Sequence, residues 1–232
     1  RQLLLFTLLG LTSLISMAQT EIRKDVFGHL RQGALILSEG TMVSGSEKIE
    51  KYTSNFLSAN GKIKSYKKSF DISVNQNLDY EIGEIQTANG MFSVMFLKNK
   101  PNSTSSTIEL LVIYKNDSPS GDLDVLKNRR EEWMKLCNSH KANELVKQLY
   151  SKEAFYYNRG RLLKGTSAIS AEYGYMNSSS YSLQLTPKHI VFVTDDIVFE
   201  VGRCSGSYPL PYMLLWEKQT NGEWQVLLDS NY

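Results

Sequence analysis

The sequence predicts an α+β fold made of two tandem copies of one small unit, preceded by a signal peptide. Three observations support this: segments that recur at a nearly constant spacing, strand-like alternation in both halves, and helix-like spacing ahead of the second copy. We expect the signal peptide at 1–18, the first copy at 19–117 and the second, complete copy at 118–232.

The first residues have the pattern of a secretory signal. Arg1 precedes an apolar stretch from Leu3 to Leu14, and Ser16-Met17-Ala18 supplies the small residues that a signal peptidase reads. The apolar run is too short to span a bilayer comfortably, so we expect no membrane association after cleavage near Gln19. The alternative is a buried first helix over 3–17. The expected location is periplasmic or extracellular.

The repeat is visible as matching residues at one spacing. At an offset of 120 residues, the positions that coincide without a gap are Ala34 and Ala154, Gly40 and Gly160, Gly45 and Gly165, and Ile49 and Ile169. Leu78–Gly83 recurs at an offset of 119 as Ile197–Gly202, and two later segments follow at 120 and 116. This constancy predicts a duplicated unit rather than one large domain.

Both copies predict the same order of elements. A short apolar strand is followed by a glycine turn, and a second glycine precedes a helix that Ser46 or Thr166 caps. Three strands with period-two alternation follow. Ahead of the second copy, Leu126, Trp133 and Cys137 fall at helical spacing, after a turn-rich linker at 117–121.

The second copy resembles the nuclear transport factor 2-like superfamily, most closely its SnoaL-like and ketosteroid-isomerase-like members. The residues that carry the resemblance are 148–154, the turn at 160–165 with Ile169, and 216–224. The resemblance implies cone-shaped units, each a curved, mostly antiparallel sheet wrapped around N-terminal helices that leave a pocket. The first copy has too few residues before Gly33 for both helices, so we expect it to be degenerate and the pocket to lie in the second copy.

Composition limits the classes of partner. Lys and Arg number 26 against 24 Asp and Glu, a net charge of +2, which argues against nucleic acid as the main partner. Cys137 and His140 have the spacing of half a metal site without a second pair, so we expect neither a metal nor a cofactor. Whether Cys137 pairs with Cys204 is left open.

The catalytic candidates are carboxylates. In ketosteroid isomerisation a carboxylate base works with a tyrosine and a protonated acid. By the resemblance these roles fall at Asn158, near Trp133 or Met134, and near Tyr212, which excludes that reaction. Glu200, in the middle of a strand, and Asp229, near the end of the last strand, remain candidate bases. The alternative for Glu200 is that its side chain faces solvent on the open side of the sheet. The alternative for Asp229 is that it pairs with a nearby Lys or Arg.

Aromatic content favours a binding pocket over catalysis. The expected ligand-binding residues are Trp133, Tyr150, Tyr157, Glu200, Tyr212 and Trp216. Aromatic walls with a few polar groups suit a small, partly apolar ligand, although the same rings can simply fill a core. The sequence therefore favours an exported, non-catalytic binding protein. A small hydrolase, isomerase or cyclase and a protein-interaction module remain alternatives. We expect a monomer whose two copies pair within one chain.

Overall fold

The computed structural model describes residues 26–100 and 106–232. These divide into two compact units: 26–69 with 82–100 and 106–114, and 70–81 with 115–232. The predicted signal peptide at 1–18 lies outside the described residues, as does most of the chain that would precede the first strand. The predicted boundaries, the cleavage near residue 19 and the degeneracy of the first copy stay predictions.

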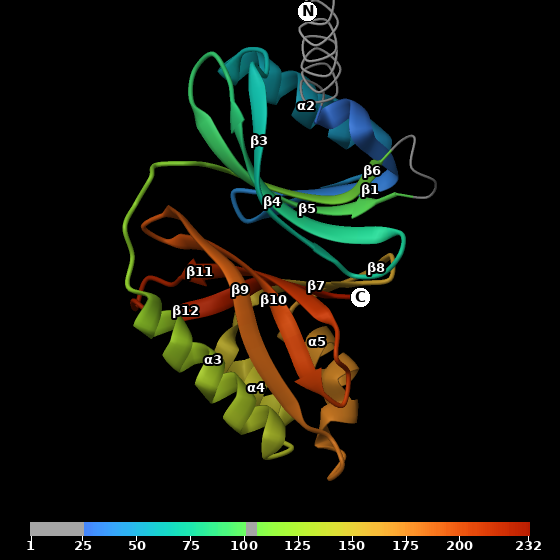
Figure 1. Cartoon of the computed structure of the whole chain (residues 1–232), viewed down its shortest axis with the longest axis vertical. Helices are drawn as coiled ribbons and strands as arrows, with labels where there is room; N and C mark the ends of the chain where they lie inside the picture. Colours follow the sequence, from blue (N-terminus) through green and yellow to red (C-terminus); the bar gives the residue numbers. More distant parts are fainter. Residues whose placement is uncertain (1–25, 101–105) are drawn as a thin grey trace, which may run out of the picture. The chain divides into compact units, whose positions relative to one another are not determined.

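The first sheet has six strands in the order β2-β1-β6-β5-β4-β3 (Figure 1). Its elements are η1 (Phe27–His29), β1 (Leu30–Ser38), β2 (Thr41–Ser44), α2 (Ser46–Asn60), β3 (Ser65–Ser73), β4 (Leu78–Gln86), β5 (Met91–Asn99) and β6 (Thr107–Lys115). Phe56 of α2 packs with Phe27 and Phe92 in an apolar core on one face of this sheet.

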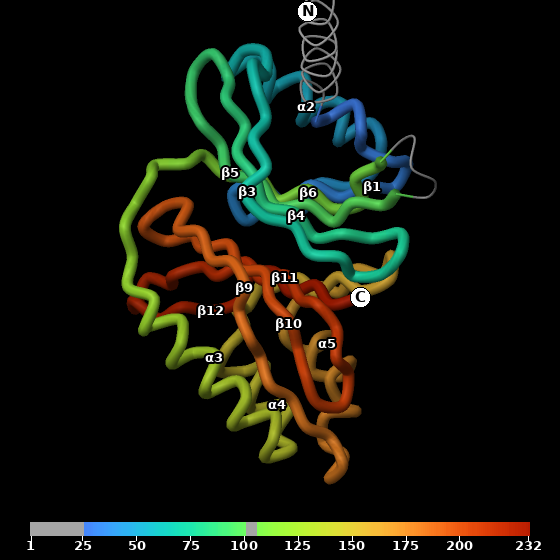
Figure 2. The backbone as a smooth tube through the Cα atoms, in the orientation of Figure 1, coloured from blue at the N-terminus to red at the C-terminus, as the bar shows by residue number. Residues whose placement is uncertain are grey.

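The second sheet repeats this order as β8-β7-β12-β11-β10-β9. Its elements are α3 (Leu123–Asn138), α4 (Ala142–Leu149), β7 (Tyr150–Asn158), β8 (Arg161–Lys164), α5 (Thr166–Glu172), η2 (Tyr173–Asn177), β9 (Leu183–Thr194), β10 (Ile197–Gly206), β11 (Pro211–Lys218) and β12 (Trp224–Asn231). Figure 2 follows the chain through the first sheet in blue to green and then through α3, α4 and the second sheet in yellow-green to red.

Both sheets are mixed and open. Two of the strand pairs among the described residues are parallel, namely β1–β6 and β7–β12. The pairs β1–β2, β7–β8, β9–β10, β10–β11 and β11–β12 are antiparallel. The predicted α+β class with two sheet-containing units is confirmed, and the identical strand order fits two tandem units. The structure differs in one respect, because four strands follow the short helix of each unit where the sequence predicted three.

The additional strands, β3 and β9, are edge strands. β3 carries Lys67 and Lys68, and β9 carries Pro187 and Lys188. An edge strand pairs on one side only, so it tolerates charged residues and proline that a central strand would exclude. Their weak alternation follows from this position in the sheet.

The glycine turns have the conformation that the repeat predicts. Glu39 and Gly40 both have positive φ, 50° and 71°, and Arg159 and Gly160 have 48° and 78°. Two successive positive-φ residues make the two-residue hairpin turn whose twist matches that of the strands. These turns join β1 to β2 and β7 to β8 in the same way.

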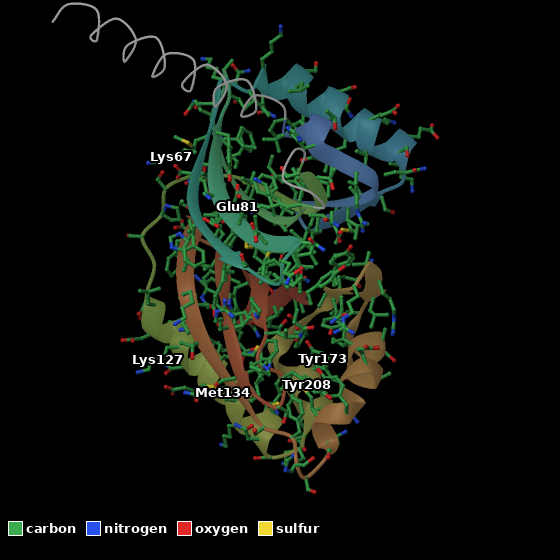
Figure 3. The ribbon with its side chains drawn as sticks, turned by 45° about the vertical axis from the view of Figure 1, so that its right-hand side comes forward. Lys67, Glu81, Lys127, Met134, Tyr173 and Tyr208 are labelled. Carbon is green, nitrogen blue, oxygen red and sulfur yellow. The ribbon has the colours of Figure 1, made fainter. Side chains whose placement is uncertain are left out.

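Helix α3 lies against the second sheet through one stripe of residues. Asp122 accepts a hydrogen bond from the Asp124 backbone N–H at 2.8 Å and so caps the helix. Leu126, Arg130, Trp133 and Cys137 are buried at helical spacing, whereas Lys127 faces solvent (Figure 3). In the described part of the chain, every helix is too short or too polar to cross a bilayer.

Gly202 of β10 makes room for a side chain of the neighbouring strand. It pairs with Tyr212, and a Cβ atom at residue 202 would lie 2.4 Å from the Tyr212 hydroxyl oxygen. The Tyr212 ring crosses over Gly202 to reach Glu200, to which its hydroxyl donates at 2.7 Å.

We expect Gly202→Ala to lower the free energy of unfolding by about 1–3 kcal/mol, because the ring must move from a packed site. Gly174→Ala is the matched control, since nothing lies within 4 Å of its added Cβ. That control should leave stability unchanged or raise it by up to about 1 kcal/mol. Urea unfolding measures both. Equal effects would contradict the close approach of Tyr212 to Gly202.

Candidate functional site

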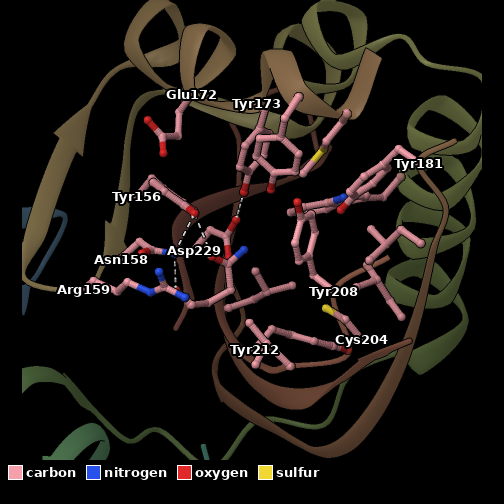
Figure 4. A pocket seen from close by; sticks show the side chains of 18 residues that line it. Tyr156, Asn158, Arg159, Glu172, Tyr173, Tyr181, Cys204, Tyr208, Tyr212 and Asp229 are labelled. Carbon is pink, nitrogen blue, oxygen red and sulfur yellow. Dashed lines mark hydrogen bonds between the residues drawn. The ribbon is translucent and has the colours of Figure 1, made fainter. Parts of the chain in front are cut away.

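The second unit contains a cavity of about 260 Å³ that is open to solvent on one side. It is bounded by the inner face of the second sheet, by η2 with the end of α5, and by Trp133 of α3. The lining residues are Trp133, Tyr156, Asn158, Arg159, Glu172, Tyr173, Tyr175, Met176, Tyr181, Leu183, Leu185, Cys204, Tyr208, Leu210, Tyr212, Leu214, Asp229 and Asn231. Figure 4 shows Asp229 near its centre, between Tyr156 with Asn158 and Tyr208 with Tyr181.

A β-bulge places the polar residues of β12 inside the cavity. The pairing of β12 with β11 shifts between Val226, opposite Trp216, and Leu228, opposite Leu215. Val226 packs in the inner core, so without the shift the alternation would place Leu228 there and Asp229 on the other face. The extra residue reverses this order, and Asp229 and Asn231 line the cavity instead.

Asp229 is 2% exposed and accepts hydrogen bonds from two tyrosines. The Tyr150 hydroxyl donates to its Oδ2 at 2.7 Å, and the Tyr173 hydroxyl donates to the same oxygen. No described residue donates to Oδ1, and no described Lys, Arg or His forms an ion pair with this carboxylate. Burial raises the pKa of Asp229 to about 6, and the two tyrosine hydrogen bonds act in the opposite direction.

A second polar network closes the neighbouring side of the cavity. The Tyr156 hydroxyl donates to Asn231 Oδ1 at 2.7 Å, and the Asn158 amide donates to the Asn231 backbone carbonyl at 2.7 Å. These bonds join the ends of β7 and β12. They orient the Tyr156 ring beside Asp229, with which Tyr156 pairs across the two strands.

Tyrosines surround the remaining walls and the mouth. Tyr175 packs edge-on against Tyr181 and Tyr208, with ring centroids 5.4 and 5.8 Å apart. Tyr175 and Tyr208 are 40% and 56% exposed, whereas Tyr173 is fully buried. Figure 3 labels Tyr173 and Tyr208 within the second unit. The rings thus pass from the surface to the interior.

Trp133 contributes an unsatisfied donor. This side chain is 3% exposed and lines the cavity, and its Nε1–H has no hydrogen-bond partner among the described residues. A buried donor without a partner costs about 1–3 kcal/mol.

Glu200 lies on the inner face but outside the cavity lining. It is fully buried, and Arg130 Nη1, the Tyr212 hydroxyl and Trp216 Nε1 donate to its carboxylate at 2.8, 2.7 and 2.9 Å. Burial raises its pKa, and the nearby Arg130 charge opposes that change. Three donors occupy this carboxylate, so its geometry is that of a structural ion pair between α3 and β10.

The structure separates the residues that the sequence grouped together. Trp133, Tyr212 and Asp229 line the cavity, whereas Tyr150, Glu200 and Trp216 are buried beside it. Tyr150 acts on the cavity through Asp229. Tyr157 is not a lining residue, because strand alternation turns Tyr156 inward and Tyr157 to the opposite face. The solvent-facing alternative for Glu200 is wrong, since this side chain is fully buried.

Several residues in and beside the cavity were absent from the sequence prediction. Arg130 lies on the same helical stripe as Leu126 and Trp133. A charged residue on an apolar stripe could have been used to predict a buried ion pair. The tyrosines of 173–181 were visible as a cluster in the sequence. Asn231 gave no signal, because its inward position depends on the β12 bulge.

The cavity holds neither an ionised thiol nor a metal cluster. Cys137 and Cys204 are free thiols, and burial raises the pKa of each to about 12. Cys204 therefore lines the cavity as an uncharged thiol at neutral pH. No group of three His, Cys, Asp or Glu side chains able to hold a metal ion occurs among the described residues.

Solved structures similar to this chain are described as nuclear transport factor 2-like, cystatin-like or ketosteroid isomerase-like. An NTF2-like protein of unknown function from Shewanella oneidensis MR-1 shares 16% identity, covers 47% of this chain and 96% of its own, and has a TM-score of 0.42. A ketosteroid isomerase-like protein from Erwinia carotovora atroseptica shares 16%, covers 49% and 98%, and has a TM-score of 0.37. A cystatin-like-fold domain of unknown function from Nostoc punctiforme shares 16%, covers 48% and 78%, and has a TM-score of 0.39.

Each of these matches covers about half of the chain. No family model and no curated protein matches the chain. The chemistry of the cavity therefore has to come from its own residues.

We expect Arg130→Met to lower the free energy of unfolding by about 3–5 kcal/mol, because it leaves Glu200 charged and buried without its partner. Arg161→Met removes an exposed arginine–glutamate pair, with Glu172, in which Arg161 is 64% exposed. That control should cost at most about 1 kcal/mol. Denaturant unfolding at pH 7 compares the two variants, and similar losses would contradict a buried ion pair.

Asp229 predicts a pH dependence of stability. Because its folded pKa of about 6 lies above the usual value of 3.8, its protonated form favours the folded state below about pH 4. That stabilisation, about 3 kcal/mol, is lost as the pH rises through 6. Asp229→Asn should remove this loss. The free energy of unfolding of the wild type minus that of the variant should therefore fall between pH 4 and 7. A constant difference across that range would show that Asp229 titrates normally.

Proposed function

We propose that the second unit is a non-catalytic binding module for a small, partly apolar ligand. The observation that carries the proposal is the 260 Å³ cavity, with tyrosine walls and a few polar groups on one side. Pockets with this division of apolar and polar surface are typical of small-molecule sites, whose volumes start at about 300 Å³. The ligand is therefore smaller than a typical drug-sized molecule.

The first unit supports this assignment by contrast. Ile36 pairs with Leu111 between β1 and β6, in the positions that Tyr156 and Asp229 occupy between β7 and β12. Both Ile36 and Leu111 are fully buried in the apolar core of that unit. The two sheets have the same strand order, but at these positions the first carries apolar residues and the second carries polar ones.

Proton transfer is the second candidate function, and Asp229 is the observation that favours it. Its pKa of about 6 suits a general base near neutral pH, and its Oδ1 has no donor within the described residues. Glu200 is the weaker candidate, since three donors hold its carboxylate. Export and pairing of the two copies within a monomer stay predictions, and neither bears on the cavity.

Filling the cavity tests the binding function. Leu214 pairs with Asp229 across β11 and β12 and lines the cavity, so Leu214→Phe should occupy ligand volume. We expect benzyl alcohol to shift the Trp133 indole N–H resonance of the wild type, and its affinity to fall at least tenfold in this variant. The matched control is Leu123→Phe on the exposed start of α3, where residue 123 is 53% exposed.

Native mass spectrometry of the gently purified protein completes the test. A co-purified molecule that the wild type holds and Leu214→Phe loses would support binding. Chemical conversion of that molecule by the wild type, abolished in Asp229→Asn, would favour proton transfer instead. Unaltered benzyl alcohol binding in Leu214→Phe, or none in the wild type, would overturn the cavity as the binding site.

A further inference from the structure

We propose that the cavity ligand is a small organic cation, an amine whose ammonium group binds Asp229 and whose body packs on the tyrosine rings. This rests on the proposed function and specifies its ligand class. Three features of the described residues carry the inference: an uncompensated carboxylate, aromatic walls, and an excess of acidic lining groups.

The first feature is the difference between the two buried carboxylates. Glu200 has Arg130 at 2.8 Å, whereas no described cationic side chain forms an ion pair with Asp229. The two tyrosines that donate to Asp229 are neutral, and both donate to Oδ2. Oδ1 is thus the acceptor that a ligand N–H could reach. A buried charge is costly unless it is paired, so a cationic ligand would supply the missing partner.

The second feature is the composition of the walls. The faces and edges of tyrosine rings surround the space beside Asp229, among them Tyr156, Tyr173, Tyr175 and Tyr181. An aromatic face attracts a cation by about 0.5–2 kcal/mol, most strongly where water is excluded. Aromatic rings together with one acid make a site that favours an ammonium over an equally large neutral group.

The third feature is the balance of charge along the lining. Asp229 and Glu172 are acidic, and Arg159 is the basic lining residue. Arg159 is exposed at the hairpin turn between β7 and β8, and Glu172 is paired with Arg161 at 2.6 Å. Asp229, which is 2% exposed, is therefore the buried charge among these three groups.

The tyrosine hydroxyls and the thiol packed around Asp229 stay uncharged near neutral pH. They are Tyr150 and Tyr156 of β7, Tyr173 and Tyr175 of η2, Cys204 of β10 and Tyr212 of β11. Burial raises the pKa of every one of these groups. Between pH 5 and 7.5 the ionisation of Asp229 therefore governs the charge inside the cavity.

The experiment compares benzylamine with benzyl alcohol, which have nearly the same shape and differ in charge. Binding is followed through the indole N–H resonances of the full chain, with Trp133 as reporter. We expect benzylamine to bind at least tenfold more tightly than benzyl alcohol at pH 7.5. Its affinity should rise about tenfold from pH 5 to 7.5 as Asp229 ionises, while that of benzyl alcohol stays constant.

Asp229→Asn should weaken benzylamine binding at least tenfold and change benzyl alcohol binding less than threefold, which also shows that the cavity remains formed. Asp195→Asn, the same change on the exposed turn after β9, is the matched control and should alter neither affinity. If the variant does not fold, the pH dependence of the wild type decides. Equal affinities for the two probes, or affinity for benzylamine that is independent of pH, would overturn the cationic ligand and leave the binding module standing. Binding of neither probe would overturn both proposals.

Discussion

The cavity depends on the buried ion pair between Arg130 and Glu200, which holds α3 on the inner face of the second sheet. Arg130 reaches Glu200 from one turn before Trp133, so this contact sets where the Trp133 ring lies over the sheet. Tyr212 and Trp216 supply further donors to Glu200, and Gly202 leaves the space that Tyr212 needs. A purely apolar contact would tolerate sliding of the helix, whereas a carboxylate with three directed donors has one satisfied geometry. The ion pair therefore fixes the position of α3 on the sheet beside the cavity.

The second constraint is the single inserted residue in β12. Strand alternation allows only one set of side chains on the inner face, and the bulge exchanges that set midway along the strand. Before the bulge, Trp224 and Val226 belong to the apolar core. Beyond it, Asp229 and Asn231 join the polar end of the cavity. One strand thereby serves both the core and the site, without any change in the order of the sheet.

The repeat made the fold readable from the sequence, because strand and turn residues recur where the backbone requires them. The paired glycines at 40 and 160 occupy the same positive-φ turn, and the helical spacing of Leu126 and Trp133 is that of α3. The residues of the site could be predicted less well from the sequence. The choice between Tyr156 and Tyr157 depends on the register of β7, and the inward turn of Asp229 depends on a bulge that has no residue signature. Edge strands β3 and β9 were missed since solvent contact weakens their alternation.

Asp229 is costly to the fold, and that cost points to a role outside folding. The first unit forms the same strand order with Leu111 in the corresponding register, so the sheet does not need an acid there. Near neutral pH the ionised, buried Asp229 forgoes about 3 kcal/mol relative to its protonated form. The hydroxyls of Tyr150 and Tyr173 reduce this cost without supplying a positive charge. A residue that breaks the apolar pattern at a stability cost, inside the cavity rather than in an ion pair, is typical of a binding or catalytic site. A cation bound at Oδ1 would stabilise the folded state most at the pH where the empty cavity is least stable.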